Sequence, residues 1–359
     1  MSGMLTYHNY SLSQIPDLDG KVAVITQLNY HVLTHHKCSE ISTQCLLHGI
    51  KKLYIVARSQ VKYDGAVDAW RRDPRIKLGE WNTEAEGDEM WKSRTEFIPC
   101  DLGDMLQVRR AAGEIKRRTD RLDILFCNAG LPIIPAHTLS PQSIETIFAS
   151  NYVGHYILTT LLLPLLKSTI AHSPHPHSPA TNARVVVTSS SLHHLCRELN
   201  LDLVTSKDPI KSRCYDGIWR YARSKLANIL FTRELARRRD DVDDDATKHI
   251  YANSFFPGNI ATEQMDIWKQ YLGGILGRLV KWYFALAGQS TRDGAATAMY
   301  LGASGDVIGM EGIKGEYFIP IARKGSTSGI GNDMELAKTL WDWTDNKVTE
   351  VMGNGWQKI

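Results

Sequence analysis

The strongest constraint on the fold is an alternation of short apolar runs with helical segments along most of the chain. The first run, KVAVIT at residues 21–26, is rich in β-branched residues and follows Asp19-Gly20. An apolar run bounded by turn residues is typical of a buried strand. Further runs of this kind lie at residues 52–58, 95–101, 122–130, 184–191, 250–258 and 315–320.

Helical patterns separate these runs, at residues 40–48, 106–118, 143–167 and 218–239. Strands that alternate with helices indicate βαβ units, and hence a parallel sheet covered by helices on both faces. Because βαβ crossovers are right-handed, we expect an α/β, doubly wound, Rossmann-like sheet of about seven strands.

The domain organisation follows from the same pattern. At roughly 100–200 residues per domain, a chain of 359 residues allows one large domain or two ordinary ones. The runs recur without a linker, which predicts a single domain over residues 1–359 with a core at about 19–343. The excess length is assigned to insertions at residues 27–38, 73–91, 172–182 and 201–217.

Composition limits the cellular compartments and the classes of binding partner to be expected for this chain. A hydrophobic fraction of 43% excludes a wholly disordered chain, and a net charge of +3 is too small to indicate nucleic-acid binding. The six cysteines include no C-x-x-C, and the polar N-terminus lacks an apolar signal segment. No uninterrupted apolar run reaches the roughly 20 residues of a membrane helix. We therefore expect a cytoplasmic protein without a transmembrane segment.

A tyrosine and a lysine four residues apart provide the sharpest chemical signal. Tyr221 and Lys225 lie in the predicted helix at residues 218–239, in the sequence YARSK. Residues at this spacing share one helix face. An ammonium near a phenol favours the phenolate, so Lys225 is expected to lower the pKa of Tyr221 and make it a general acid or base. Alone, such a pair is also ordinary on helix surfaces.

Hydroxyl and amide groups gather at the carboxyl ends of predicted strands. Three serines at residues 189–191 follow the run RVVVT, and Asn128 ends the run LDILFC. Ligands of a parallel sheet bind at this edge. A serine hydroxyl there can hydrogen-bond a carbonyl oxygen that gains negative charge, although serines after strands also cap helices and turns.

Together these motifs resemble the short-chain dehydrogenase/reductase family, most closely its branch of retinol dehydrogenases and fungal reductases. The resemblance covers most of the chain, from residue 19 to residue 343. It is carried by Asp101-Leu102, NAG at residues 128–130, Asn151 in FASNYVGHYILTTLLLPLL, Ser190 in VVVTSSSLHH, Tyr221 and Lys225 in YARSKLANILFTRELARR, and Pro257-Gly258 with Thr262.

The resemblance implies an oxidoreductase that interconverts a carbonyl and an alcohol with a nicotinamide cofactor. Tyr221 would donate the proton, Lys225 would lower its pKa and bind the nicotinamide ribose, and Ser190 would polarise the carbonyl. Ser191 competes with Ser190 for that role. Asn151 would hold a water in the proton relay. Contacts with adenine, ribose and carboxamide are implied for Asp101, Asn128, Ile260 and Thr262.

The end of the second predicted strand indicates the cofactor. A Rossmann site for NAD places an acidic residue there, whereas arginine accommodates a 2′-phosphate. This chain has Arg58 at that point, in Val56-Ala57-Arg58. We therefore expect NADP(H), with a solvated surface arginine as the alternative interpretation.

The first turn departs from the family pattern T-G-x-x-x-G-x-G. No glycine occurs between Gly20 and Gly49, and His36-Lys37-Cys38 stands where Gly-x-Gly belongs. A Cβ where phosphate must approach the backbone is a steric problem. The chain could be a weakened descendant, the segment at residues 27–38 could be a gene-model artefact such as a retained intron, or Lys37 could meet the phosphate. We favour the artefact, and we predict that this polypeptide binds NADPH poorly.

An amphipathic stretch at residues 265–288 (MDIWKQYLGGILGRLVKWYFALAG) is expected to wall an apolar substrate pocket or to pack in the core. Peripheral membrane contact by such a basic amphipathic helix is a third alternative. The histidine clusters at residues 31–36 and 172–177 lack zinc-ligand spacing, so no metal site is predicted. His193 and His194 are expected to line the pocket wall without a catalytic role.

Two hypotheses follow. The first is an NADP(H)-dependent reductase or dehydrogenase that acts on a small apolar carbonyl or alcohol, in secondary (natural-product) metabolism. The second is a catalytically impaired pseudoenzyme or binding protein, which the missing glycine-rich loop motivates. The helix at residues 218–239 could support a homodimer.

Overall fold

The apolar runs of the sequence become the strands of one sheet. The computed structural model describes residues 9–27, 40–76, 84–173, 181–207, 216–240, 244–259, 289–309 and 313–358. Within these ranges the strands are β1 (Val22–Thr26), β2 (Lys52–Ala57), β3 (Thr95–Pro99), β4 (Ile124–Cys127), β5 (Ala183–Thr188), β6 (Ile250–Phe255), β7 (Tyr317–Ile319) and β8 (Arg323–Lys324).

The order of the described strands across the sheet is β3-β2-β1-β4-β5-β6-β7-β8. All neighbours are parallel except β7 and β8, which form an antiparallel edge pair. The strand order reverses between β1 and β4, so the crevice outside their carboxyl ends is the place where such folds bind ligands. The predicted doubly wound sheet is confirmed, with β8 as an additional short strand.

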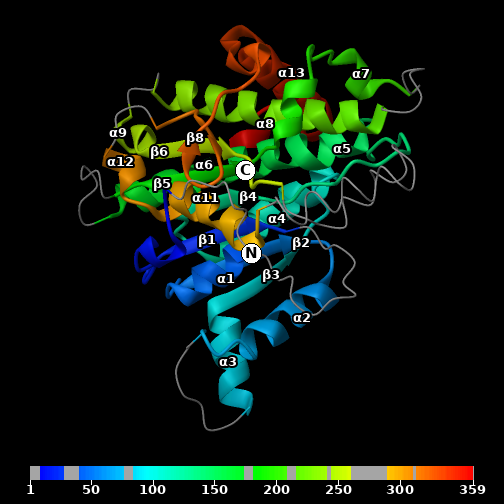
Figure 1. Cartoon of the computed structure of the whole chain (residues 1–359). Helices are drawn as coiled ribbons and strands as arrows, with labels where there is room; N and C mark the ends of the chain where they lie inside the picture. The colour runs from blue at the N-terminus through cyan, green and yellow to red at the C-terminus, as the bar shows by residue number, and fades with distance from the viewer. Residues whose placement is uncertain are drawn as a thin grey trace, which may run out of the picture.

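Helices cover both faces of the sheet (Figure 1). The described α-helices are α1 (Glu40–Leu47), α2 (Gln60–Arg71), α3 (Glu84–Arg94), α4 (Met105–Arg118), α5 (Thr146–Phe148), α6 (Gly154–Ala171), α7 (Asp202–Thr205), α8 (Asp216–Asp240), α9 (Asp245–Lys248), α11 (Thr291–Ala303), α12 (Asp306–Gly309) and α13 (Met334–Met352). A π-helix, η2 (Ala149–Val153), joins α5 to α6, and 3-10 helices are η1 (Leu12–Gln14), η3 (Ser191–Leu195), η5 (Gly329–Asn332) and η6 (Trp356–Lys358).

The burial pattern explains why the strands are apolar on both sides. Val22 and Val24 pack into a core with α4, α6, α8 and α13, whereas Ala23 and Ile25 pack into a second core with α1, α2, α3 and α11. Successive residues of a strand point to opposite faces, so a sheet covered twice needs a continuous apolar run. Tyr10 and Trp356 are buried in these cores, outside the core limits predicted from the sequence.

Part of the predicted insertion at residues 73–91 is helical, because α3 begins at Glu84. In α3, Trp91 stacks on Trp70 of α2 with ring centroids 6.5 Å apart, and both side chains are buried. Burial of two indoles offsets the polar composition of this segment. Residues 77–83 of this insertion, residues 28–38 of the first, and residues 174–180 and 208–215 of the other two lie outside the described residues.

Helix α13 packs against α8, the helix that we considered for a homodimer (Figure 1). Trp341 of α13 stacks on Phe231 of α8 with ring centroids 5.8 Å apart, and Arg238 pairs with Asp342 at 3.0 Å. The face of α8 that carries Phe231 is therefore occupied within the chain itself.

One helical stretch among the described residues, Thr146–Ala171, is apolar and long enough to cross a membrane, with mean hydropathy 1.3. Of its most apolar window, 83% is buried inside the fold. A stretch buried in this way serves as a core helix of the sheet.

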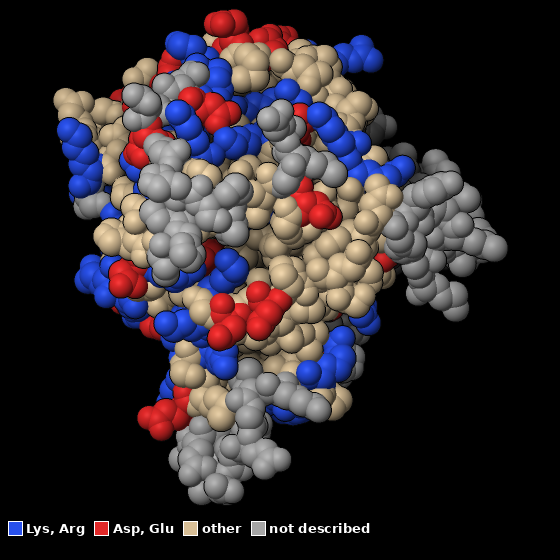
Figure 2. Space-filling view, turned by 90° about the vertical axis from the view of Figure 1, so that its left-hand side faces the viewer, with Lys and Arg blue, Asp and Glu red and all other residues tan. Residues whose placement is uncertain are grey.

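On the face of the molecule in Figure 2, basic and acidic side chains are interspersed.

Candidate active site

The predicted catalytic side chains meet at the carboxyl edge of the sheet. Asn151 lies in η2, Ser190 is the second residue after β5, and Tyr221 and Lys225 lie on α8. Helix α8 packs against β5, β6 and η2, and η3 packs against α8. The structure thus brings together four residues that are up to 74 positions apart in the sequence (Asn151 to Lys225).

Ser190 and Tyr221 share a hydrogen bond between their side chains. Ser190 is buried and also accepts a bond from the backbone N–H of Leu192 at 3.2 Å, which caps η3. Its carbonyl oxygen lies 2.6 Å from Nδ1 of His193, a buried ring that fixes the backbone at this point. The serine therefore has both the N-cap role and the contact with the phenol.

The other two serines face elsewhere. The Ser189 hydroxyl donates to the carbonyl of Lys225 at 2.7 Å, so it ties β5 to α8. Ser191 begins η3. Of the three, Ser190 is the serine with a side-chain bond to Tyr221, which favours it over Ser191 for the predicted role.

The expected lowering of the Tyr221 pKa is wrong for this structure. Burial raises the pKa of Tyr221 to about 12, and the hydrogen bond with Ser190 opposes that rise. The Lys225 Nζ lies 5.6 Å from the centre of the Tyr221 ring and donates to the carbonyl of Thr188 at 3.0 Å. Desolvation of the phenolate thus outweighs the attraction of the ammonium.

Lys225 is the buried cation of the site. Its side chain is 2% exposed, and burial lowers its pKa from 10.5 to about 8. Lys225 also lies close to the turn after β4: a Cβ added to Gly130 would stand 3.1 Å from its Nζ and 3.5 Å from Oδ1 of Asn151. A glycine at this position therefore allows the backbone to approach both side chains.

The Asn151 side chain binds the backbone of the loop after β4. Its Oδ1 accepts from the N–H of Leu131 at 2.6 Å, and its Nδ2 donates to the carbonyl of Leu131 and to the hydroxyl of Ser224, each at 3.1 Å. Asn151 lies in the π-helix, where Gly154 N–H donates to the Ala149 carbonyl five residues earlier. Single π-turns of this kind are frequent at functional sites.

Two positioning residues were missed by the sequence analysis. The Thr26 hydroxyl, at the end of β1, accepts from the N–H groups of Asn128 and Ala129 at 2.9 and 3.0 Å. It thereby fixes the turn after β4 at the switch point of the sheet. Threonines at strand ends are common, so the sequence alone could not single out Thr26. The contact depends on the pairing of β1 with β4.

Arg220, beside Tyr221 on α8, is the second positioning residue that the sequence analysis missed. Its guanidinium pairs with Glu145 at 2.9 Å and Asp216 at 2.6 Å, and it donates to the carbonyls of Ile134 and Pro135. Arg220 and Glu145 are 2% and 1% exposed. This buried ion pair fastens the loop after β4 to the helix that carries Tyr221.

The predicted cofactor residues are placed as follows. Arg58 directly follows β2 and Asp101 follows β3, with the guanidinium 4.0 Å from the carboxylate. Both are partly exposed at the carboxyl edge, as a site for the adenine end of a dinucleotide requires. Asn128 lies in the turn after β4, where its Oδ1 accepts from the Thr188 hydroxyl at 3.3 Å. Ile260 and Thr262 lie outside the described residues, as do residues 28–39 and 265–288.

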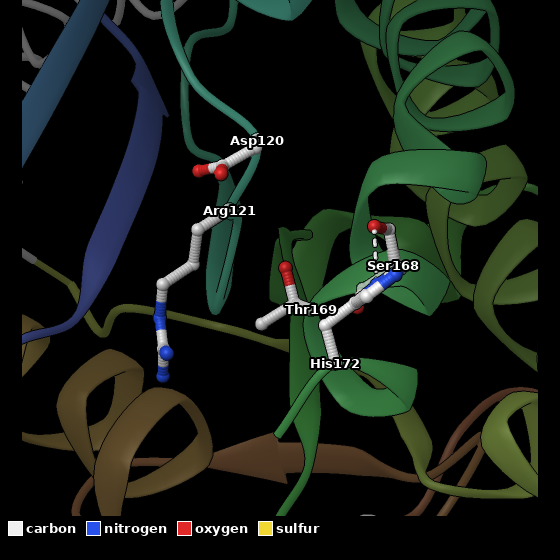
Figure 3. A pocket seen from close by; sticks show the side chains of 5 residues that line it. All are labelled: Asp120, Arg121, Ser168, Thr169 and His172. Carbon is white, nitrogen blue, oxygen red and sulfur yellow. Dashed lines mark hydrogen bonds between the residues drawn. The ribbon is translucent and has the colours of Figure 1, made fainter. Parts of the chain in front are cut away.

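A pocket at the opposite, amino-terminal edge of the sheet contains none of these residues (Figure 3). Its lining is formed by Asp120, Arg121, Ser168, Thr169 and His172. The Thr169 hydroxyl accepts from the N–H of Leu122 at 2.7 Å, and Arg121 binds Asp123, so these groups hold the fold together. Among the described residues, no group of three His, Cys, Asp or Glu side chains could hold a metal ion.

Comparisons with known proteins agree with this geometry. The sequence model of short chain dehydrogenases matches residues 66–196. A short-chain dehydrogenase/reductase of Armillaria gallica is 30% identical over 336 residues, which cover 94% of this chain and 93% of that protein. Retinol dehydrogenase 14 of Mus musculus is 34% identical over 253 residues, covering 70% of this chain and 65% of that protein.

Solved structures share the fold. A protein of Mycobacterium paratuberculosis superposes with a TM-score of 0.63 at 22% identity, covering 95% of this chain and 97% of that chain. A short chain dehydrogenase of Escherichia coli CFT073 in complex with NADPH gives 0.52 at 16% identity, covering 85% and 98%. With its sheet order, its edge of polar residues and these relatives, the chain belongs to the short-chain dehydrogenase/reductase family.

Proposed function

We propose that the protein is an NADP(H)-dependent oxidoreductase that interconverts a carbonyl and a primary or secondary alcohol on an apolar substrate. The observation that carries the proposal is the cluster of Ser190, Tyr221 and Lys225 at the carboxyl edge. In it, one hydrogen bond joins the serine to the phenol, and a buried ammonium lies one helical turn away.

The protonation states suit reduction. Because burial raises the pKa of Tyr221 to about 12, the phenol carries its proton at neutral pH and can donate it to a carbonyl oxygen. The Ser190 hydroxyl, bonded to the same phenol, can donate to that oxygen as negative charge develops. Lys225, with its pKa lowered to about 8, remains largely charged near pH 7, and its ammonium favours the phenolate that forms once Tyr221 has donated its proton.

The described residues fit the adenine and ribose ends of the cofactor. The exposed guanidinium of Arg58 suits a 2′-phosphate, and Asp101 and Asn128 lie at the same edge of the sheet. Gly130 leaves room beside Lys225 and Asn151, where a Cβ would stand 3.1 Å from the lysine Nζ. When bound, NADPH supplies the hydride. A structural relative in complex with NADPH supports this choice of cofactor.

The remaining assignments rest on resemblance. The role in secondary metabolism remains a proposal from the resemblance, and the relatives named retinol and polyprenol dehydrogenases support an apolar substrate. We propose a cytoplasmic location; peripheral membrane contact through residues 265–288 is an alternative. Because α13 covers part of α8, we expect a homodimer, if one forms, to use another face.

The test is Tyr221→Phe, which removes the phenol O–H and little else. NADPH oxidation with a panel of apolar ketones and aldehydes is expected to fall to background, while NADPH binding in a titration is retained. Tyr54→Phe is the matched control, because its buried hydroxyl donates to the carbonyl of Arg118 far from the site. Unchanged turnover in Tyr221→Phe would contradict the role of the tyrosine.

A second candidate function is a pseudoenzyme that binds without catalysis, since no glycine occurs between Gly20 and Gly49. On this hypothesis the chain binds NADPH weakly and oxidises none with any carbonyl. Restoring a T-G-x-x-x-G-x-G loop at residues 26–38 is then expected to restore binding. Saturable tight binding by the unaltered chain would reject the pseudoenzyme.

A further inference from the structure

A buried histidine links the end of β1 to the π-helix that carries Asn151. His155, in the first turn of α6, is fully buried. Its Nδ1 lies 2.9 Å from the Asn151 carbonyl oxygen, and its Nε2 lies 2.8 Å from the Thr26 hydroxyl oxygen. One ring therefore touches two elements, and its partner Thr26 lies 129 positions away from it in the chain.

The partners fix the protonation of this ring. A carbonyl oxygen can only accept, so Nδ1 carries the proton and donates it to Asn151. Burial lowers the pKa of His155 to about 4, so the ring is neutral at pH 7 and Nε2 accepts the proton of the Thr26 hydroxyl. The two lone pairs of that hydroxyl accept from the N–H groups of Asn128 and Ala129. The Phe126 carbonyl is a second acceptor for the Thr26 hydroxyl at 3.4 Å, and His155 Nε2, at 2.8 Å, is the nearer one.

The Asn151 carbonyl matters because the Asn151 side chain is already occupied. Both ends of its amide bind Leu131, and the nitrogen also binds Ser224. Both Nδ2 hydrogens are therefore used, and a water in a relay to Lys225 would bind one of the two oxygens of Asn151, each of which has two lone pairs. His155 binds the backbone carbonyl oxygen at 2.9 Å, so the ring fixes the orientation of that oxygen beside Lys225.

We propose that His155 is a positioning residue: it holds the Asn151 carbonyl at one ring nitrogen and the Thr26 hydroxyl at the other, so that the turn after β4 and the π-helix keep a fixed geometry beside Lys225. This inference rests on the proposed function, because it assigns to the Asn151 carbonyl the water of the proton relay. Thr26 and His155 act through Asn128 and Asn151 and touch no reacting atom themselves.

Two conservative variants separate the two ends of the bridge. His155→Asn places an amide N–H near the position of Nδ1 and keeps the bond to Asn151, whereas His155→Gln reaches the position of Nε2 and keeps the bond to Thr26. We expect kcat within about threefold of wild type for Asn, and a loss of about tenfold or more for Gln, with the substrate KM unchanged in both. A kcat for His155→Gln that equals the wild-type value would overturn the proposal, and so would a larger loss in His155→Asn than in His155→Gln.

Thr169→Val is the matched control for stability. Thr169 lies on the same helix, is buried, and bridges α6 to Leu122 at the opposite edge of the sheet (Figure 3). Its loss is expected to lower the thermal midpoint as much as His155→Gln does and to leave kcat unchanged. If kcat falls with the midpoint in both variants, His155 contributes only stability and the proposal fails.

A spectroscopic measurement needs no activity. Ring ¹⁵N shifts of the whole protein, assigned by comparison with His155→Gln, are expected to show Nδ1 protonated and Nε2 bare at pH 7. A ring protonated at Nε2, or one that titrates near the ordinary value of 6.5, would overturn the bridge. A chain that shows the expected ring but reduces no carbonyl contradicts the proposed function and its relay, and leaves the bridge itself established.

Discussion

Buried charged side chains at the two edges of the sheet differ in how completely the protein satisfies their hydrogen bonds. At the amino-terminal edge, Asp123 is 2% exposed, and its carboxylate accepts two bonds from Arg121 at 2.7 Å and one from the N–H of Val22 at 2.9 Å. At the carboxyl edge, Lys225 is equally buried, and among the described residues one hydrogen bond, to the carbonyl of Thr188, serves its three donor positions.

The difference shows at which edge of the sheet a buried charged group keeps unused hydrogen-bond positions. A buried charge whose hydrogen bonds are all satisfied by fixed groups stabilises the fold or costs little. A buried cation without a carboxylate partner destabilises the fold, and its pKa falls, as it does for Lys225. Groups of this kind concentrate at functional sites because ligands supply the missing partners. We therefore infer that the carboxyl edge holds the reacting groups and that the amino-terminal edge stabilises the fold.

The largest expected effect comes from Lys225→Met. The side chain keeps a similar volume and loses the ammonium, so kcat is expected to fall by about a hundredfold or more, because the proton relay and the cofactor contact are both lost. Stability at pH 7 should be unchanged or higher, since an incompletely bonded buried charge has been removed.

The measurement is NADPH oxidation beside urea unfolding. Loss of activity together with a large loss of stability would break the comparison, because Lys225 would then be a structural residue. Lys116→Met on α4 is the matched control, and it should alter neither quantity by much, as Lys116 lies far along the chain from the site.

The second largest effect is a loss of stability expected at the amino-terminal edge of the sheet. Asp123→Asn keeps an acceptor for the Val22 N–H but removes the charge that binds Arg121, so the free energy of unfolding is expected to fall by about 2 kcal/mol. Activity per folded molecule should stay the same. Asp120→Asn, an exposed neighbour, is the control for the loss of one carboxylate. A fall in kcat without a fall in stability would contradict the structural role of this edge.

Much of the fold was predictable because its signals are local. The strands were found from apolar runs, and helices α1, α4, α6 and α8 from periodicity. Helix α13 was missed although its buried residues Ala337, Leu340, Trp341, Thr344 and Val348 follow helical spacing. The signal was therefore present in the sequence. In contrast, α3 has no clear apolar face, and only its packing against α2 explains it.

The candidate site was predictable as a set of residue types but not as a network. The spacing of Tyr221 and Lys225 showed that the two share a helix face, yet it could not show how far burial would raise the tyrosine pKa. The bridge through His155 and the clamp of Arg220 on Glu145 join residues 129 and 75 positions apart. Such contacts depend on sheet order and helix packing, which no local pattern contains.

The third prediction concerns pH. The pKa of Lys225 is about 8 in the folded protein and 10.5 as the ordinary value, so between these limits the unfolded chain holds more protons at this residue. Stability contributed by Lys225 therefore rises with pH across that window. The gap in unfolding free energy between Lys225→Met and wild type is expected to be widest below pH 8 and to shrink toward pH 10.5. Other titrating groups occur in both proteins and cancel; a gap that is constant with pH would show that Lys225 is not destabilised by burial.

The smallest effect is expected for Lys21→Met at the amino-terminal edge. Lys21 Nζ lies 3.6 Å from Asp123, and 33% of its side chain is exposed, so water already solvates the ammonium. Exposed ion pairs contribute roughly 0–1 kcal/mol, and a loss in the lower half of that range is expected by urea unfolding. Arg121→Met removes the two-point contact with the same carboxylate and should cost more, because it leaves Asp123 buried with unfilled acceptor positions. Equal losses of unfolding free energy in Lys21→Met and Arg121→Met would mean that net charge near Asp123, and not its filled hydrogen-bond positions, stabilises this edge. The contrast with Lys225 would then have to be explained by charge alone.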